Sequence, residues 1–209
     1  RLDGILKAEC GGDAAVAWDA SETAPGLLFG SCLHSSAGAE QALYEEMTLD
    51  ATAAHLVDAL GEYNVASTKP MNLVFFRDAC LHLARISRVL TQPRGCSLLV
   101  GVGGSGRSSL VRLAASMWGY PCHTIEITKS YDSSAFHDDL KRFMFDAGCK
   151  AKPTVFLFSD TQIISESFLE DINNLLNAGE VPNLMEPEDM ERILADVRPL
   201  AKAAGRPES

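Results

Sequence analysis

The most informative stretch of this sequence is Gly101-Val102-Gly103-Gly104-Ser105-Gly106-Arg107-Ser108-Ser109. An apolar run at residues 97–100 precedes it, and Leu110, Leu113, Ala114 and Met117 follow at helical spacing. The predicted order is therefore strand, glycine loop and helix, the setting of a phosphate-binding loop. The pattern for such loops is G-x-x-x-x-G-K-[S/T], in which Arg107 replaces the lysine. An ordinary glycine-rich turn is the alternative, but the flanking elements favour a nucleotide-binding loop.

The glycines of this stretch let the backbone turn so that its amides point inward and surround phosphate oxygens. The following helix directs its partly positive N-terminus at the same point. A hydroxyl directly after the cation is the expected Mg²⁺ ligand, and Ser108 holds this position, with Ser109 beside it. We therefore expect ATP or ADP with Mg²⁺ at residues 101–109. The planar fork of Arg107 keeps the charge of a lysine but seeks bidentate partners.

A second candidate segment follows the run Thr154–Phe158, which is apolar throughout and therefore belongs in the middle of a parallel sheet covered by helices. The next four residues are Ser159-Asp160-Thr161-Gln162, where a nucleotide-hydrolysing fold carries Asp-Glu. That Asp holds the Mg²⁺ shell and that Glu polarises the attacking water. In register, Ser159 replaces the Asp and Asp160 the Glu. Shifted by one residue, Asp160 becomes the metal-side acid and Thr161 replaces the base.

Asp160 is therefore the candidate catalytic and metal-binding acid, and one carboxylate is missing in either register. Arg107 and Ser159 are expected on opposite sides of one phosphate site. Loss of positioned charge of this kind slows a reaction by about 10²-fold or more. The sequence predicts a site that holds a nucleotide with little or no hydrolysis.

Hydrophobic periodicity predicts helices around these segments. The first two are expected from the N-cap Thr48 to about Gly61, and from Met71 to Gln92 with Leu73 and Phe76 on the apolar face. Later helices are expected at residues 108–118, 133–148 (capped by Ser133 or Ser134), 167–177 and from Pro187, with a strand at 122–127. Ser167 with Glu170 matches a capping box, Leu169 and Leu176 are expected to face the core, and Arg198-Pro199 reads as linker.

Composition excludes several classes of function. The chain has 209 residues, 46% of them apolar, and a net charge of −10 at pH 7. This acidity argues against nucleic acid as a partner. No apolar run approaches the roughly 18 residues that a membrane span needs, so we expect no membrane insertion. Six cysteines are scattered without a C-x-x-C pair, and no signal-peptide pattern is visible, which is typical of reduced thiols in an intracellular, cytoplasmic protein.

Several strings resemble the fourth AAA module of dynein heavy chains. They are Met71–Phe76, Pro93–Gly95, Leu98–Ser109, Phe156–Ile163 and Ser165–Leu184. The most specific is Phe168-Leu169-Glu170-Asp171-Ile172-Asn173-Asn174-Leu175-Leu176-Asn177-Ala178-Gly179-Glu180-Val181-Pro182-Asn183-Leu184. The loop arginine and the Ser-Asp-Thr-Gln segment are more similar to axonemal, single-headed inner-arm dyneins than to the cytoplasmic form. The resemblance covers about residues 27–205.

This resemblance implies an α/β fold of the P-loop NTPase (AAA+) type, a three-layer αβα core whose parallel sheet is truncated before its fourth strand. It implies a ring of six AAA+ modules, ATP hydrolysis mainly in the first, a microtubule-binding stalk after the fourth, and a regulatory or structural nucleotide in the fourth. The implied partners are neighbouring AAA+ modules, microtubules through the stalk, and dynein intermediate and light chains. The implied setting is the cytoskeleton of the axoneme, in an ATP-hydrolysing motor of cilia or flagella.

Three regions are expected: 1–47 as a lead-in from the preceding module, 48–93 as a helical lead, and 94–209 as an incomplete P-loop core. No candidate fourth strand, sensor, arginine finger or lid follows Asn183. We therefore expect a piece of a longer protein, poorly soluble and without cooperative unfolding by itself. Two other classes stay open: a P-loop kinase or transferase, and a structural ring segment that binds no nucleotide.

Overall fold

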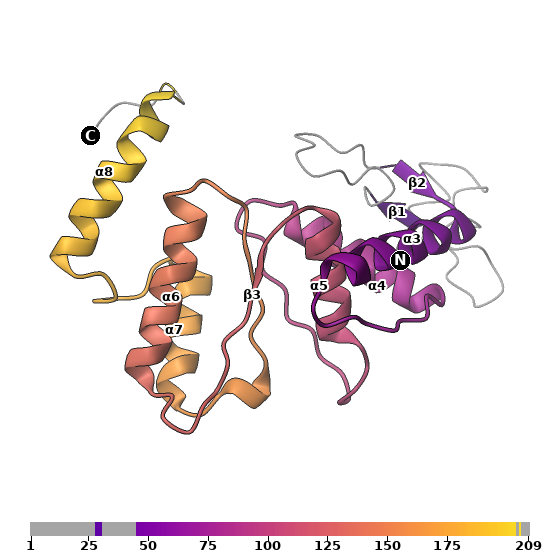
Figure 1. Ribbon diagram of the computed structural model, residues 1–209, viewed down its shortest axis with the longest axis horizontal. Coiled ribbons are helices and arrows are strands. Elements are labelled where there is room, and N and C mark those ends of the chain that lie inside the picture. Colours follow the sequence, from indigo (N-terminus) through magenta and orange to yellow (C-terminus); the bar gives the residue numbers. More distant parts are fainter. Residues whose placement is uncertain (1–27, 31–44, 204, 206–209) are drawn as a thin grey trace, which may run out of the picture. The chain divides into compact units, whose positions relative to one another are not determined.

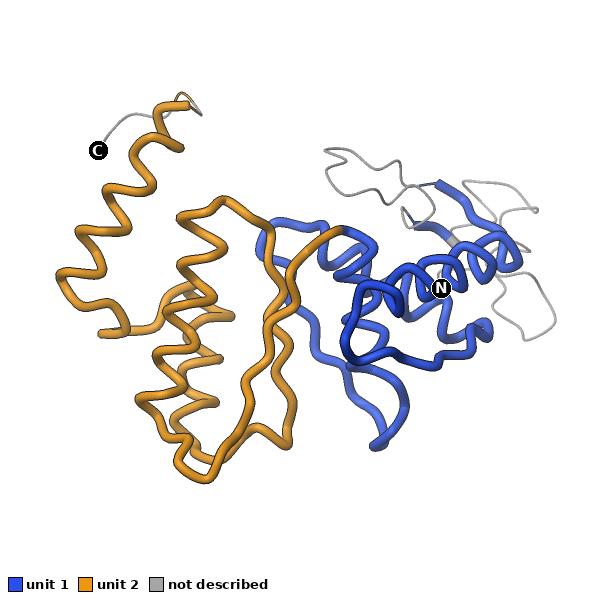
Figure 2. Tube along the Cα trace, viewed as in Figure 1, with its two compact units in different colours: residues 1–118 blue, residues 119–209 orange. Residues whose placement is uncertain are grey.

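The computed structural model describes residues 28–30, 45–203 and 205 (Figure 1). The chain divides into two compact units, residues 1–118 and 119–209, each described by itself (Figure 2). The expected lead-in at residues 1–47 lies mostly outside the described residues. The three expected regions therefore stay a prediction.

The described residues of the first unit form a small antiparallel pair of strands and three helices. Its elements are β1 (Leu28–Gly30), β2 (Glu45–Met47), α3 (Leu49–Ala66), α4 (Arg77–Leu90) and α5 (Arg107–Met117). The strands β1 and β2 pair antiparallel. Helix α4 packs against α5, and both contribute fully buried residues, among them Cys80, Leu83 and Leu113. The indole of Trp118 donates a buried hydrogen bond to Ser87 Oγ, so the apolar contact also satisfies its polar atoms.

The ends of the first helices correct two sequence predictions. Thr48 is the N-cap of α3, as predicted, because its Oγ1 accepts a hydrogen bond from the Ala51 amide. The helix continues past Gly61 to Ala66, since an exposed glycine costs only about 1 kcal/mol in a helix interior and does not end it. Helix α4 begins at Arg77 rather than Met71, and its extended N-cap Phe76 is 62% exposed instead of lying on the apolar face.

The strand predicted directly before the glycine loop is absent from the described residues. Residues 96–100 form neither a strand nor a helix, and Leu98 and Val100 are 88% and 83% exposed. A strand exists only where its backbone pairs with a neighbour. Among the described residues of this unit, β1 and β2 pair with each other and no strand lies beside 96–100.

The second unit is α/β with a parallel pair of strands, as predicted. Its elements are β3 (Cys122–His123), α6 (Ser133–Gly148), β4 (Val155–Phe156), the 3-10 turn η2 (Asp160–Gln162), α7 (Glu166–Asn177) and α8 (Pro187–Ala203). The register pairs Cys122 with Val155 and His123 with Phe156. Both strands are shorter than the predicted runs 122–127 and 154–158. Helix α6 connects them, which is the usual crossover between parallel strands.

An aromatic core holds α6 and α7 together. Phe136 and Phe168 are fully buried and stack with their ring centroids 4.1 Å apart. The other buried members of the cluster are Ile125, Leu140, Phe143, Val181 and Leu184. The N-cap of α6 is Asp132, not Ser133 or Ser134, because the Asp132 carboxylate accepts a hydrogen bond from the Ala135 amide at 2.9 Å. The buried side chains of α6 and α7 therefore pack against each other, and the two helices lie side by side in Figure 1.

Helix α8 lies on α6 through polar contacts. Lys141 Nζ and Asp189 Oδ2 are 2.9 Å apart, and the Arg192 guanidinium lies 4.5 Å from the centre of the Phe145 ring. The described residues of α8 include no buried side chain. The helix continues through Pro199, which corrects the linker prediction: a proline removes one N–H donor but leaves the helical bonds on either side in place.

Candidate phosphate-binding loop

The backbone of the glycine loop has the conformation that its glycines allow. Gly104 and Gly106 have φ angles of 77° and 78°, in the left-handed region that side chains disfavour. The Ser105 amide donates a hydrogen bond to the Val102 carbonyl at 3.3 Å and closes the turn between them. The turn therefore favours glycine at positions 104 and 106. Gly106 is a glycine of the predicted pattern, whereas Gly104 stands at one of the variable positions of that pattern.

The amides at the start of α5 are open to a ligand. Gly106 is the N-cap, has no side chain, and offers no side-chain acceptor to the first turn. Its carbonyl accepts from the Leu110 amide at 2.9 Å, whereas among the described residues no acceptor faces the amides of Arg107, Ser108 or Ser109. The first turn also contains no acidic residue. An anion fits this helix start, because open amides and the helix dipole both favour negative charge.

The side chain of Arg107 lies on the loop itself. Its Nη1 donates to the Leu99 carbonyl at 3.1 Å and its Nη2 donates to the Val102 carbonyl at 3.1 Å. A Cβ added at Gly101 would lie 3.5 Å from Arg107 Cδ and 3.4 Å from Ser105 Oγ, so the arginine stem crosses directly over Gly101. The bidentate partners that the planar fork seeks are thus two backbone carbonyls.

The serines after the arginine remain accessible. Ser108 is exposed and Ser109 is half-buried. The first turn of α5 therefore presents the Ser108 hydroxyl next to the open amides, where a Mg²⁺ ion bound with a phosphate group needs an oxygen ligand. Within the described residues, no group of three or more His, Cys, Asp or Glu side chains forms a separate metal cluster.

The second candidate segment is a closed turn at the end of β4. Asp160 is exposed, and its Oδ1 accepts from the Thr161 amide at 3.0 Å. Gln162 Oε1 accepts from the Ser159 amide at 2.7 Å. The side-chain amide of Gln162 donates to Thr124 Oγ1 at 3.0 Å and to the Ile125 carbonyl. Gln162 therefore ties the end of β4 to the chain that follows β3.

This role of Gln162 was not expected from the sequence. A signal was present, because a serine followed three residues later by Gln is one form of the capping box. Gly101–Ser109 lie together in the first unit, whereas Ser159 and Asp160 belong to the second. The expectation that Arg107 and Ser159 lie on opposite sides of one phosphate site therefore stays a prediction.

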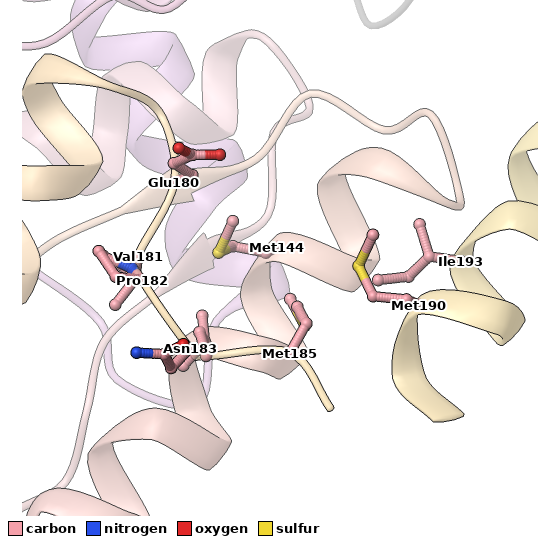
Figure 3. Close-up of a pocket in the computed structure, with 9 residues that line it drawn as sticks. Met144, Glu180, Val181, Pro182, Asn183, Met185, Met190 and Ile193 are labelled. Carbon is pink, nitrogen blue, oxygen red and sulfur yellow. The ribbon is translucent and has the colours of Figure 1, made fainter. Parts of the chain in front are cut away.

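The second unit also contains an open apolar pocket of about 470 Å³ (Figure 3). It lies between α6, the segment 180–185 and α8, and its lining residues are Met144, Glu180, Val181, Pro182, Asn183, Leu184, Met185, Met190 and Ile193. Glu180 is the only ionisable residue among them. The pocket offers apolar and thioether surface rather than the donors that a phosphate needs.

Comparisons with known proteins agree on one family. The family model of the P-loop containing dynein motor region D4 matches residues 71–209. The chain is 48% identical over 180 residues to human dynein axonemal heavy chain 6 and 51% identical over 173 residues to human dynein axonemal heavy chain 2. It is 57% identical over 139 residues to the dynein-1-beta heavy chain of the flagellar inner arm I1 complex from Chlamydomonas reinhardtii.

These matches cover 86%, 81% and 66% of this chain, respectively, but only 4%, 4% and 3% of the three relatives. The chain thus spans about one twenty-fifth of the length of the curated relatives that it matches. In the part of the chain that the structure describes, no helix is long and apolar enough to cross a membrane.

Proposed function

Because this chain belongs to the family of the P-loop containing dynein motor region D4, we propose that it is a nucleotide-holding AAA+ module of an axonemal dynein heavy chain. The observation that carries the proposal is the open start of α5. Three backbone amides and the Ser108 hydroxyl follow a loop that contains two left-handed glycines, of which Gly106 is a glycine of the phosphate-binding pattern. ATP or ADP binds at Gly101–Ser109, with its phosphates against these amides.

Mg²⁺ accompanies the nucleotide in this proposal. When bound, it would supply positive charge that neutralises phosphate oxygens. Ser108 would be its ligand from α5, and Asp160 is the acidic ligand that the sequence predicts. The chain's own contribution is to orient the phosphates with backbone amides whose positions are fixed by the first turn of α5.

The module hydrolyses its nucleotide slowly or not at all. A hydrolytic site combines a lysine on the phosphates with two carboxylates after the third strand, whereas this chain has Arg107, Ser159 and Asp160 in those places. Asp160 alone does not both hold the metal shell and polarise water. The nucleotide then acts as a regulatory or structural element, because the site lacks a carboxylate that hydrolysis needs.

The wider function follows the names of the relatives, which are axonemal and flagellar inner-arm heavy chains. The module belongs to a microtubule motor that drives ciliary or flagellar movement and is located in the axoneme. Its direct partners are the neighbouring AAA+ modules. Microtubules, through the stalk, and the intermediate and light chains are partners of the whole motor.

Local hydrogen exchange tests the binding proposal, because it reports on this loop even where other nucleotide sites are present. The full natural chain is compared with and without Mg–ADP, and peptides covering residues 99–110 are followed. We expect slower exchange with nucleotide, and a weaker Mg²⁺ dependence in Ser108→Ala. Ser116→Ala is the matched control, because Ser116 is exposed at the far end of the same helix.

A structural ring segment that binds no nucleotide is the second candidate. The engagement of Arg107 with the carbonyls of Leu99 and Val102 favours it, since the cation already has partners. In that case Mg–ADP and Mg–ATP leave the exchange of residues 99–110 unchanged in every variant. That result would reject the nucleotide-holding module.

A further inference from the structure

We infer that Arg107 is an internal strap that holds the loop closed and that a nucleotide must displace. The strap is the Arg107 side chain together with its two hydrogen bonds to the carbonyls of Leu99 and Val102. The inference rests on the proposed function, because it describes how nucleotide access to that same loop is controlled. In this inference, the carbonyls of Leu99 and Val102 compete with the phosphate for the Arg107 guanidinium.

The strap ties the start of α5 to the chain that enters the loop. The donors Nη1 and Nη2 reach carbonyls on either side of Gly101, and the arginine stem crosses the glycine between them. Arginine is suited to this task because its two terminal nitrogens lie in one rigid plane. A flexible lysine has a single ammonium and holds two separated carbonyls less well.

The Val102 carbonyl links the strap to the shape of the loop. It accepts from Arg107 Nη2 at 3.1 Å and from the Ser105 amide at 3.3 Å. The strap therefore steadies the acceptor that closes the turn. The Ser105 amide becomes a reporter of the strap, since its exchange depends on the position of that carbonyl.

The same guanidinium is the only cationic side chain within residues 101–109. A phosphate at the start of α5 attracts this charge, and bonds from a cation to phosphate are stronger than bonds from a cation to a neutral carbonyl. Binding therefore exchanges one set of hydrogen bonds for another. The favourable free energy of nucleotide binding is reduced because the two hydrogen bonds of Arg107 are lost. The native loop therefore binds nucleotide less tightly than a loop with lysine at position 107.

The first test measures the strap without any nucleotide. In the full natural chain, we expect the Ser105 amide to exchange about fivefold faster in Arg107→Ala and Arg107→Lys than in the native protein. Arg112→Ala is the matched control, because it removes the next arginine of α5 and leaves the loop contacts in place. Equal exchange in the native protein and both Arg107 variants would overturn the strap.

The second test measures displacement. Mg–ADP is titrated while the exchange of residues 99–110 is followed, and Arg107→Lys is expected to reach half-protection at a concentration at least about threefold lower than the native protein. This readout separates displacement from a merely structural role, because a damaged loop would bind less tightly. A midpoint that is equal or higher in Arg107→Lys would overturn the inference.

The two tests also separate this inference from the proposed function. If Mg–ADP protects the native loop but the lysine variant has the same midpoint, the module binds nucleotide and the strap alone is wrong. If no variant is protected at any Mg–ADP concentration, both the nucleotide-holding module and displacement are rejected. Faster exchange of the Ser105 amide together with a lower midpoint supports both.

Discussion

Single residues decide whether the loop keeps its shape. Gly103 and Gly104 are neighbours, and a Cβ at either would meet no atom within 4 Å. They differ in backbone conformation, because a left-handed φ of 77° is recorded for Gly104 but no left-handed value for Gly103. The pair therefore isolates the effect of conformation from the effect of space.

Gly104→Ala is expected to weaken nucleotide protection of residues 99–110, whereas Gly103→Ala is expected to leave it nearly unchanged. An alanine at a left-handed position costs about 1 kcal/mol, so the Mg–ADP midpoint should rise about fivefold in Gly104→Ala alone. Exchange titrations of the two variants in the full natural chain measure this difference. Equal midpoints in the two variants would show that the left-handed turn is not needed.

Gln162 is the second residue whose side chain holds a candidate segment in place. Gln162→Leu removes its bonds to Ser159, Thr124 and Ile125, and should destabilise the end of β4 by about 1–2 kcal/mol. We expect this destabilisation to appear as faster hydrogen exchange of the amides at residues 157–163 in Gln162→Leu. The control is Gln92→Leu, the same change at an exposed turn. Similar exchange in both variants would mean that Gln162 does not tie the two segments.

At the scale of elements, the N-caps of the helices were predicted only in part. The Thr48 cap was confirmed because a cap is a local pattern of a few residues. The cap of α7 was predicted two residues too late: Ser165, not Ser167, is the N-cap, and Ser165 Oγ accepts from the Ser167 amide. In serine-rich segments several hydroxyls compete for one cap, and tertiary contacts decide, here the bond between Ser133 and Ser167.

The apolar face of α7 was also predicted only in part. Ile172 and Leu175 pack against the core, but Leu169 and Leu176 are 47% and 55% exposed. The spacing of leucines gives an apolar stripe and does not say how much of its width a neighbour covers. Phe168, which was not assigned to the core, is fully buried against Phe136.

The attachment of α8 is expected to depend on pH at both extremes. The hydrogen bond between Lys141 and Asp189 lowers the pKa of Asp189 below its ordinary value of 3.8 and raises that of Lys141 above 10.5. The carboxylate's contribution is complete above pH 3.8 and is lost as pH falls through the lower folded pKa. The ammonium's contribution is complete below pH 10.5 and is lost as pH rises through the higher folded pKa.

Between these limits the attachment is expected to be independent of pH. At pH 7, Asp189→Asn should speed amide exchange in α8 about two- to threefold, since an exposed ion pair contributes little. The variant Glu188→Gln is the control, because Glu188 is an exposed neighbour on the same helix. Unchanged exchange in Asp189→Asn would mean that Arg192 on Phe145 alone holds α8.

At the scale of the whole molecule, apolar side chains remain uncovered. Leu98, Val100, Val102 and Val74 are each more than three quarters exposed. Surface of this kind is typical of an interface or of a region prone to aggregation. The 209-residue chain expressed by itself is therefore expected to aggregate and to show no sharp unfolding peak by calorimetry. A single cooperative peak from a monodisperse sample would contradict this.

The comparisons confirm the predicted P-loop α/β class and the resemblance to axonemal dynein heavy chains. The fold class and the family could be predicted because both depend on short local motifs that can be recognised in the sequence alone. The strand predicted at residues 97–100 failed because pairing is a property of the neighbours of a strand and not of its own residues. The partners of Arg107 could not be predicted for the same reason, since a guanidinium accepts phosphate and carbonyl alike.

The most direct measurement is a structure of the full natural chain determined after prolonged incubation with Mg–ATP. We predict an intact nucleotide at Gly101–Ser109, with its phosphates against the amides at the start of α5 and with Arg107 released from the carbonyls of Leu99 and Val102. A loop without nucleotide, with Arg107 still on both carbonyls, would contradict it.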